Sequence, residues 1–327
     1  MFDSFFKKNI ARTLFVFFSL AISSTLLMSC SNDKKDFFKI GTTLWPGYEP
    51  FYLGREKGIV NKEEFHLVEY LSASQVIQAF RNNAIDAAAL TMDEVLILAS
   101  EGFDPVVILV LDSSYGGDAI ISKAKYQSFD DLKGKKVGYE SSALGAYFLS
   151  RALNKNNLTK QNIILVPMNV NETERALKAG DVDAVVTFEP ARTRLIESGY
   201  REIFSSRDIP DEILDVLIVR RSILTEKSKS LTNLVDNWFA SLDYFNKNRS
   251  ESLGVMNQRL KLSKAGLLTA FDGIVFPDRN QNIKMLVKKE GEGGLLDVTN
   301  NLMDEMIINN LLDNKFEIND IYKSEML

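Results

Sequence analysis

Short apolar runs alternate with amphipathic stretches along most of the chain after residue 37. The runs are rich in β-branched and aromatic residues and are four to eight positions long, which is typical of buried strands. Between two of them, residues 74–81 carry apolar side chains at helical spacing. This alternation predicts an α/β fold with a largely parallel sheet. The strand candidates are residues 38–43, 65–71, 84–90, 106–111 and 119–122.

The second part of the chain repeats the plan of the first. The sequence KIG at 39–41 returns as KVG at 136–138, and IDA at 85–87 returns as VDA at 182–184, both displaced by 97 positions. Repetition at one spacing predicts two related lobes.

After a further strand candidate at 215–220, apolar side chains at helical spacing dominate residues 230–247 and 303–312. We expect these helices to return to the first lobe. The first lobe then comprises 38–121 and 216–327, and the second comprises 122–215.

The N-terminal residues resemble an export signal. Lys7, Lys8 and Arg12 precede an apolar run at 13–28, and the segment LMSC ends at Cys30, the sole cysteine of the chain. This pattern is similar to the lipobox of bacterial lipoproteins and predicts a signal peptide over 1–29 and a lipid-bearing, palmitate-type tether over 30–37. A plain signal peptide or an N-terminal membrane anchor, with a chance cysteine, is the alternative. The lipoprotein interpretation places the remaining chain outside the cytoplasmic membrane, attached through Cys30.

The composition of the chain limits the classes of partner that it can bind. The net charge of the whole chain is −5, and loss of the basic signal segment makes it more negative, which argues against nucleic acid and against a polybasic membrane patch. The single histidine, His66, lies in a strand-like alternation. With one histidine and one cysteine, we expect no transition-metal site and no cofactor.

Candidate ligand-binding residues follow from the rule that open α/β sheets bind ligands beyond the carboxyl ends of their strands. The loops selected in this way contain aromatic residues and acids but no lysine, arginine or histidine, which predicts a ligand with amino or amidine-like nitrogen. Each acid could instead cap a helix, and a helix start at 141–142 could receive a carboxylate, so a zwitterionic or neutral polar ligand stays open. The candidates are Trp45, Tyr48, Ser72, Thr91, Asp93, Asp112, Ser114, Tyr115, Asp118, Glu140, Ser141, Ser142, Glu189 and Asp215.

Four segments together resemble a known family. Besides the lipobox, these are WPGYEP at 45–50, DLKGKKVG at 131–138, and AGDVDA at 179–184 followed by Glu189 and Pro190. They are similar to the solute-binding proteins of ABC importers, in the branch that includes nitrate-, sulfonate- or bicarbonate-binding proteins and binders of a thiamine pyrimidine precursor. The similarity covers roughly 38–221 and extends only loosely into the helical tail.

The resemblance implies a type II periplasmic-binding-protein fold, an α/β fold of two lobes with a hinge and a helical C-terminal region. It also implies a small-molecule ligand, an ABC permease and ATPase as partners, and a monomeric binding protein that is not an enzyme. Trp45 and Tyr48 match the aromatic entrance, with Glu189 facing them from the second lobe. The cations that bind an oxyanion are absent from these loops. The alternatives are a ligand-binding partner of a membrane sensor and an extracytoplasmic enzyme that uses paired carboxylates.

Overall fold

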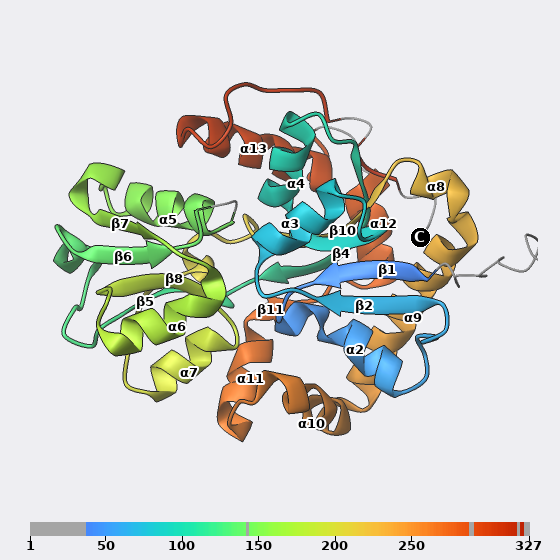
Figure 1. The fold of residues 1–327 in the computed structure, drawn as a ribbon, viewed down its shortest axis with the longest axis horizontal. Helices are drawn as coiled ribbons and strands as arrows, with labels where there is room; N and C mark the ends of the chain where they lie inside the picture. The colour runs from blue at the N-terminus through green and yellow to red at the C-terminus, as the bar shows by residue number, and fades with distance from the viewer. Residues whose placement is uncertain (1–36, 142–143, 288–290, 319–320, 324–327) are drawn as a thin grey trace, which may run out of the picture. The chain divides into compact units, whose positions relative to one another are not determined.

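A computed structural model describes residues 37–141, 144–287, 291–318 and 321–323 (Figure 1). The expected signal peptide, the lipidation site Cys30 and the candidate Ser142 lie outside these residues. In the described part of the chain, no helix combines the length and apolarity needed to cross a bilayer.

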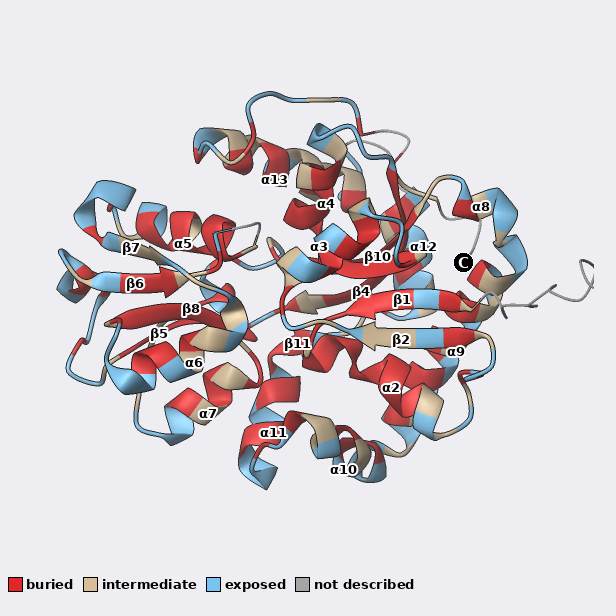
Figure 2. Cartoon of the chain, in the orientation of Figure 1, coloured by how far each residue is buried: buried red, intermediate tan, exposed pale blue. Residues whose placement is uncertain are grey.

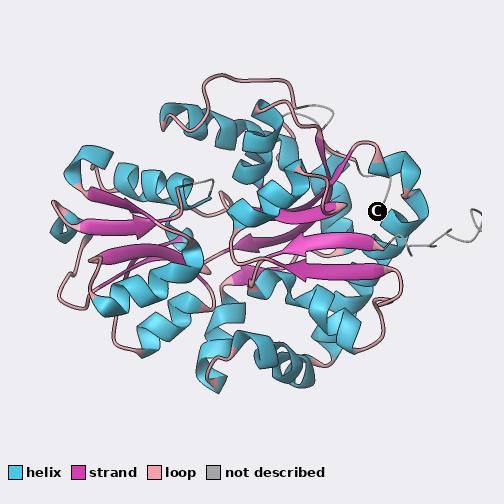
Figure 3. Cartoon of the chain, in the orientation of Figure 1, coloured by secondary structure: helices cyan, strands magenta, loops and turns pink. Residues whose placement is uncertain are grey.

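Two separate β-sheets form the framework of the α/β fold (Figures 1 and 3). The prediction of a largely parallel sheet was wrong, because both sheets are mixed: β1 pairs parallel with β2 and β3, whereas β10 pairs antiparallel with β3 and β4, and β5 antiparallel with β8 and β9. The first sheet has the strand order β11-β4-β10-β3-β1-β2, and the second has the order β7-β6-β8-β5-β9. The first consists of β1 (Phe38–Thr42), β2 (Phe65–Glu69), β3 (Ala87–Thr91), β4 (Pro105–Ser114), β10 (Leu214–Arg220) and β11 (Ile274–Val275). The second consists of β5 (Asp118–Ser122), β6 (Lys136–Tyr139), β7 (Ile164–Pro167), β8 (Ala184–Phe188) and β9 (Arg201–Ser205).

One strand lies in a different sheet from the one expected. Residues 118–121 were placed with the first lobe, but the strand Asp118–Ser122 pairs antiparallel with β8 and β9 in the second sheet. The chain therefore leaves the first sheet before residue 118 and returns by residue 214, and we call the elements around each sheet the first and second lobe.

The repeat read from the sequence is present in the strand pairing. In the first sheet Ile40 pairs with Ala87, and in the second Val137 pairs with Ala184, each residue displaced by 97 positions. The aspartates of the repeated motif also correspond. The carboxylate of Asp86 accepts from the backbone N–H of Lys39 at 2.8 Å, and that of Asp183 accepts from the backbone N–H of Lys136 at 3.2 Å.

Helices cover both faces of each sheet, with their buried sides turned to the strands (Figures 1 and 2). In the first lobe α3 and α4 pack on one face, and α2 and α9 on the other. In the second lobe α5 packs on one face, and α6 and α7 on the other. The helices are α2 (Glu49–Glu56), α3 (Ala73–Arg81), α4 (Met92–Ser100), α5 (Leu144–Lys155), α6 (Val170–Ala179), α7 (Ala191–Glu197), α8 (Ile223–Glu226), α9 (Ser228–Lys247), α10 (Arg249–Leu260), α11 (Lys264–Asp272), α12 (Arg279–Val287) and α13 (Leu295–Ile308).

The C-terminal helices return to the first lobe. The apolar stripe of α9 is buried, and Trp238 packs on Phe51 of α2 with ring centroids 4.6 Å apart. The last helix, α13, packs on α4 and also reaches the second lobe, where Arg151 of α5 donates to Glu305 at 2.7 Å. The helical tail thus joins the two lobes as well as completing the first.

Candidate functional site

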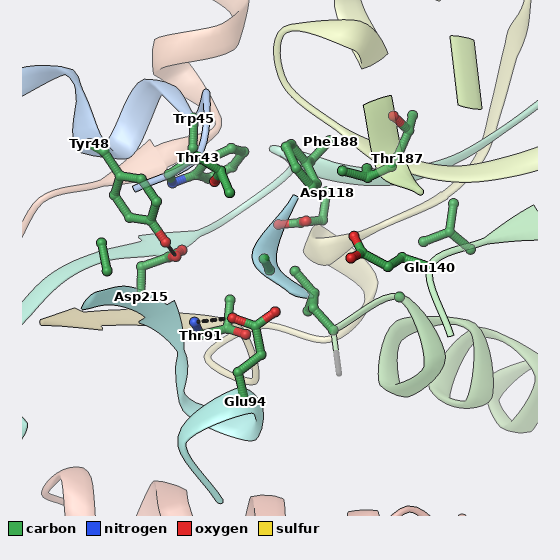
Figure 4. Close-up of a pocket in the computed structure, with 16 residues that line it drawn as sticks. Thr43, Trp45, Tyr48, Thr91, Glu94, Asp118, Glu140, Thr187, Phe188 and Asp215 are labelled. Carbon is green, nitrogen blue, oxygen red and sulfur yellow. Dashed lines mark hydrogen bonds between the residues drawn. The ribbon is translucent and has the colours of Figure 1, made fainter. Parts of the chain in front are cut away.

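A cavity lies between the two sheets, at the carboxyl ends of β1, β3 and β8 (Figure 4). The cavity volume is about 50 Å³. One water needs ~10–15 Å³ on the same measure, so the cavity is large enough for a small ligand. Its walls come from both lobes: Thr43, Trp45, Tyr48, Ala73, Ala89, Thr91, Glu94 and Asp215 near the first sheet, and Asp118, Glu140, Leu144, Gly145, Val170, Val186, Thr187 and Phe188 near the second.

The loop after β1 carries Trp45 into the cavity wall. Its indole N–H points at Asp112 of β4 and lies 3.3 Å from both carboxylate oxygens. The loop can approach so closely because position 47 is glycine: a Cβ there would lie 2.0 Å from Oδ2 of Asp112. On the other side, a Cβ on Gly117 would lie 2.4 Å from the Trp45 ring. The indole is therefore held on two sides.

Phe188, the last residue of β8, meets this indole from the second lobe. The ring centroids are 5.8 Å apart and the planes are at 89°, an edge-to-face contact. Figure 4 shows both rings beside the cavity. Because one ring belongs to each lobe, closing or opening the lobes makes or breaks this contact.

Asp215 of β10 lies opposite Asp112 in the strand register, and on its other side it lies opposite Thr91 of β3. The hydroxyl of Tyr48 donates to Oδ1 of Asp215. Burial raises the pKa of Asp215 to about 7, although the hydrogen bonds from Tyr48 and Asp112 act in the opposite direction. Burial and the negative charge of Asp215 hold the pKa of Asp112 well above its ordinary value.

Two further acids face the cavity, Glu94 from the first lobe and Asp118 from the second. Glu94 stands in the first turn of α4, where Oε2 accepts from the backbone N–H of Thr91 at 3.0 Å. Burial and the neighbouring Asp93 raise its pKa well above the ordinary value. Asp118 begins β5, and burial raises its pKa to about 8, with nearby acids adding to the effect and a hydrogen bond from Ser114 opposing it.

Glu140 connects the lobes. It follows β6 in the second lobe, and its Oε1 accepts from the backbone N–H of Ser74 at 3.3 Å and also from the Ser74 hydroxyl, in the first turn of α3. A Cβ on Gly145 would lie 2.4 Å from the carbonyl oxygen of Glu140, so the start of α5 packs directly on this backbone. One carboxylate thus lines the cavity and bonds to the opposite lobe.

The charge of the cavity is one-sided. Its described lining contains the carboxyl groups of Glu94, Asp118, Glu140 and Asp215 and contains no lysine, arginine or histidine. Elsewhere in the described residues, no group of three or more histidine, cysteine, aspartate or glutamate side chains is arranged to hold a metal ion. The arrangement offers aromatic faces and carboxyl groups, and burial favours the protonated form of Asp118 and Asp215 until a cation approaches them.

Six of the fourteen sequence candidates line this cavity, namely Trp45, Tyr48, Thr91, Asp118, Glu140 and Asp215. Asp112 lies directly behind them, against Trp45 and Asp215. Ser114 is also buried behind the wall, where its hydroxyl lies 2.9 Å from that of Ser206. Asp93 and Ser72 are buried close by, and each has a side-chain oxygen without a hydrogen-bond partner.

The remaining described candidates lie away from the cavity lining. Tyr115 is half exposed, with the guanidinium of Arg207 over its ring, and Ser141 is exposed. Glu189 is fully buried, but its oxygens accept from Arg192 at 2.8 Å and from the Thr193 hydroxyl at 2.8 Å and backbone at 3.2 Å. It therefore fixes the start of α7 rather than facing Trp45 and Tyr48.

Sequence reasoning missed Thr43, Phe188 and the apolar part of the wall, and it selected Asp93 rather than Glu94. The signal for Phe188 was available, because it ends a strand of the repeat at the cavity-facing edge. The apolar residues Ala73, Leu144, Val170 and Val186 carry no signal of their own, since their types are those of any core.

Comparison with known proteins assigns the chain to a family. Residues 31–256 match the NMT1-like family. This chain belongs to that family. A Brucella abortus protein named for binding is 25% identical over 166 residues, which are 50% of this chain and 52% of that protein. A Haemophilus influenzae protein named for thiamine biosynthesis is 22% identical over 178 residues, 54% of this chain and 56% of that one. The chain thus spans about half the length of the curated relatives it matches.

The structural likeness covers more of this NMT1-like chain. The alkanesulfonate-binding protein SsuA of Xanthomonas axonopodis, solved with MOPS, superposes with a TM-score of 0.75 at 15% identity and covers 88% of this chain and 98% of that one. The fold is therefore that of periplasmic solute-binding proteins, as the sequence resemblance implied.

Proposed function

We propose that this protein is an extracytoplasmic solute-binding protein that captures a small amine or amino-substituted heterocycle between its two lobes for an ABC importer. One observation carries the proposal: the charged groups in the described cavity lining are all carboxyls, and they stand beside the aromatic rings of Trp45, Tyr48 and Phe188.

The energetics favour a ligand that donates hydrogen bonds. A buried carboxylate without a counter-charge is costly, and a cationic or amino nitrogen offsets that cost with hydrogen bonds worth ~1.5–3 kcal/mol each. A flat or cationic group on an aromatic face adds ~1–2 kcal/mol. An amino-heterocycle satisfies both conditions, because its ring can lie against the aromatic wall while its amino groups face the acids.

The same groups oppose an oxyanion ligand. The alkanesulfonate-binding relative shares the fold, but fold does not decide ligand chemistry. A sulfonate placed here would find no cation in the described lining to pair with, and its charge would oppose ionisation of the carboxyls of Asp118 and Glu140. One relative is named for thiamine biosynthesis. Thiamine contains an amino-substituted pyrimidine ring, so this name supports the amino-heterocycle class.

A screen of thermal stability with purified protein tests the ligand class. Amines, aminopyrimidines, amino acids and sulfonates are each added in excess. A ligand at 100 times its dissociation constant stabilises the folded state by ~2.7 kcal/mol, which raises the melting temperature measurably. We expect a rise with amines or aminopyrimidines. Stabilisation by sulfonates or nitrate alone would refute the amine proposal.

We also propose that the protein is anchored by lipid on Cys30 after removal of residues 1–29. Replacement Cys30→Ala should abolish metabolic labelling with palmitate and release the protein from the membrane fraction. Wild-type labelling and fractionation in the variant would contradict the lipoprotein assignment. Deleting the gene for this protein separates transport from sensing, because ligand uptake falls only if the protein serves an importer.

Lobe closure on the ligand is the remaining part of the proposal. The chain passes between the sheets before β5 and before β10, and these two passages are the natural hinge. Small-angle scattering should give a smaller radius of gyration at saturating ligand than without ligand. An unchanged radius would indicate a rigid binding module.

A further inference from the structure

We propose that Asp112 and Asp215 hold one proton between them in the ligand-free protein, and that this carboxyl–carboxylate pair positions Trp45 and Tyr48 as a wall of the cavity. The pair belongs to two neighbouring strands of the first sheet. Asp112 does not line the cavity, so its part is that of a positioning residue. The proposal goes beyond ligand class, and it holds whatever the ligand proves to be.

The first support is geometric. Asp112 and Asp215 are directly opposite each other across the antiparallel pair β4 and β10, so their carboxyl groups lie side by side on one face of the sheet. The exposed fractions are 0% and 3%. Two ionised carboxylates at such separation, away from water, repel strongly, so one of them keeps its proton.

The second support is the charge of the surroundings. The groups that act on the pair are Tyr48 from the loop after β1, Asp93 and Glu94 from α4, and Asp118 from β5. All of them are acids or a phenol. Among the described residues that face the pair, no cation offsets a second negative charge.

The third support is a count of donors. Asp112 accepts from the Trp45 indole, and Asp215 accepts from the Tyr48 hydroxyl. Each carboxyl therefore has one donor from the aromatic wall, and the shared proton supplies the bond between them. Breaking that bond would leave two like charges side by side and would release both aromatic groups from a fixed acceptor.

The backbone packs closely against both Asp112 and the Trp45 ring, so the position of the ring is sensitive to movements of the carboxyl pair. Gly47 leaves no space between the loop and Oδ2 of Asp112, and Gly117 borders the far side of the indole. A change in the separation of the two carboxyls is therefore passed to the Trp45 ring rather than absorbed by a gap. A spectroscopic signal from the Trp45 ring therefore reports on the state of the carboxyl pair.

The test uses the full protein labelled with 5-fluorotryptophan. The chain has two tryptophans, so two fluorine resonances are expected, and loss of one in Trp45→Phe assigns it. Without ligand, the Trp45 resonance should move with pH around neutrality as the pair passes from two protons to one. In Asp112→Asn that movement should fall several-fold, because an amide keeps the hydrogen bonds but cannot titrate.

Asp104→Asn is the matched control, since it removes an exposed aspartate bonded to Arg221, away from the cavity. It should titrate like wild type. A wild-type Trp45 resonance that does not move with pH, or one that moves equally in Asp112→Asn, would overturn the proposal. If Asp112→Asn does not fold, Asp215→Asn replaces it, and infrared difference spectra of that variant must lose intensity in the protonated-carboxyl band above neutral pH.

Discussion

Trp45 and Phe188 meet edge to face at 5.8 Å, although one follows β1 in the first sheet and the other ends β8 in the second. Both rings line the cavity and each comes from a different lobe, so their contact responds to ligand binding and to lobe closure. The rings border the cavity on the side away from Glu94 and Glu140 (Figure 4). They therefore offer the ligand an apolar face opposite a set of acids.

Removing either ring should weaken ligand binding without unfolding the protein. For Trp45→Ala and Phe188→Ala we expect a loss of ~1–3 kcal/mol in binding free energy, the scale of lost stacking and cation–π contacts. Titration calorimetry with the amine or aminopyrimidine selected by the screen measures it. Tyr115→Ala is the control, because Tyr115 lies outside the cavity and should leave affinity unchanged. Equal affinity in all three variants would contradict the assigned wall.

The hydrogen bond from Ser74 to Glu140 should stabilise the closed form. Ser74→Ala removes one donor to the carboxylate and should weaken ligand binding by ~1 kcal/mol, because the bond forms only when the lobes meet. Ser72→Ala is the matched control on the same helix start, since the Ser72 hydroxyl is buried without a partner. The two dissociation constants decide the matter, and equal values would show that the contact plays no part in closure.

Asp118 and Glu189 should respond differently to loss of charge. Asp118→Asn should weaken binding of a cationic ligand by more than ~1.5 kcal/mol. Glu189→Gln should leave affinity nearly unchanged and should lower the free energy of unfolding, because the buried Arg192 loses a charged partner. Calorimetry and urea denaturation separate the two effects. An affinity loss in Glu189→Gln as large as that in Asp118→Asn would place Glu189 back at the ligand.

The ligand-free protein should lose stability as pH rises. Burial raises the pKa of Asp118 from 3.8 to about 8, so the folded state holds a proton that the unfolded chain releases. The stabilisation is complete below the unfolded value and disappears as pH increases toward the folded one. Melting temperatures across this range should therefore decline, and less steeply in Asp118→Asn. A flat wild-type profile would be inconsistent with buried, protonated acids.

Much of the framework was readable in the sequence because its signals are local and repeated. Apolar runs located the strands, and the 97-residue repeat located the matching pairs, which recur with the same register. The pairing of β5 was not readable, since an antiparallel partner distant in sequence leaves no local mark. His66 on β2 was correctly assigned to a strand, where it stacks on Phe37.

The site was predictable by loop but not always by residue. Consecutive residues at a strand end point to opposite sides, so the choice between Phe188 and Glu189 depends on one step of register. The acid Glu189 was selected for its charge, yet the neighbouring ring faces the cavity. Asp93 and Glu94 are also one residue apart, but they lie in the first turn of α4, where one step turns the side chain by about 100° around the helix axis. Residue types in the sequence selected loops that lie at the cavity, and the structure shows which side chain of each loop faces it.

The position of β10 has a consequence for how the protein is made. This strand lies in the middle of the first sheet, between β3 and β4, yet it follows the entire second lobe in the chain. Until residues 214–220 emerge, β3 and β4 have no partner between them, and the first lobe cannot complete its core. Such distant pairing slows folding. This order of assembly keeps the first lobe incomplete until most of the chain has been synthesised.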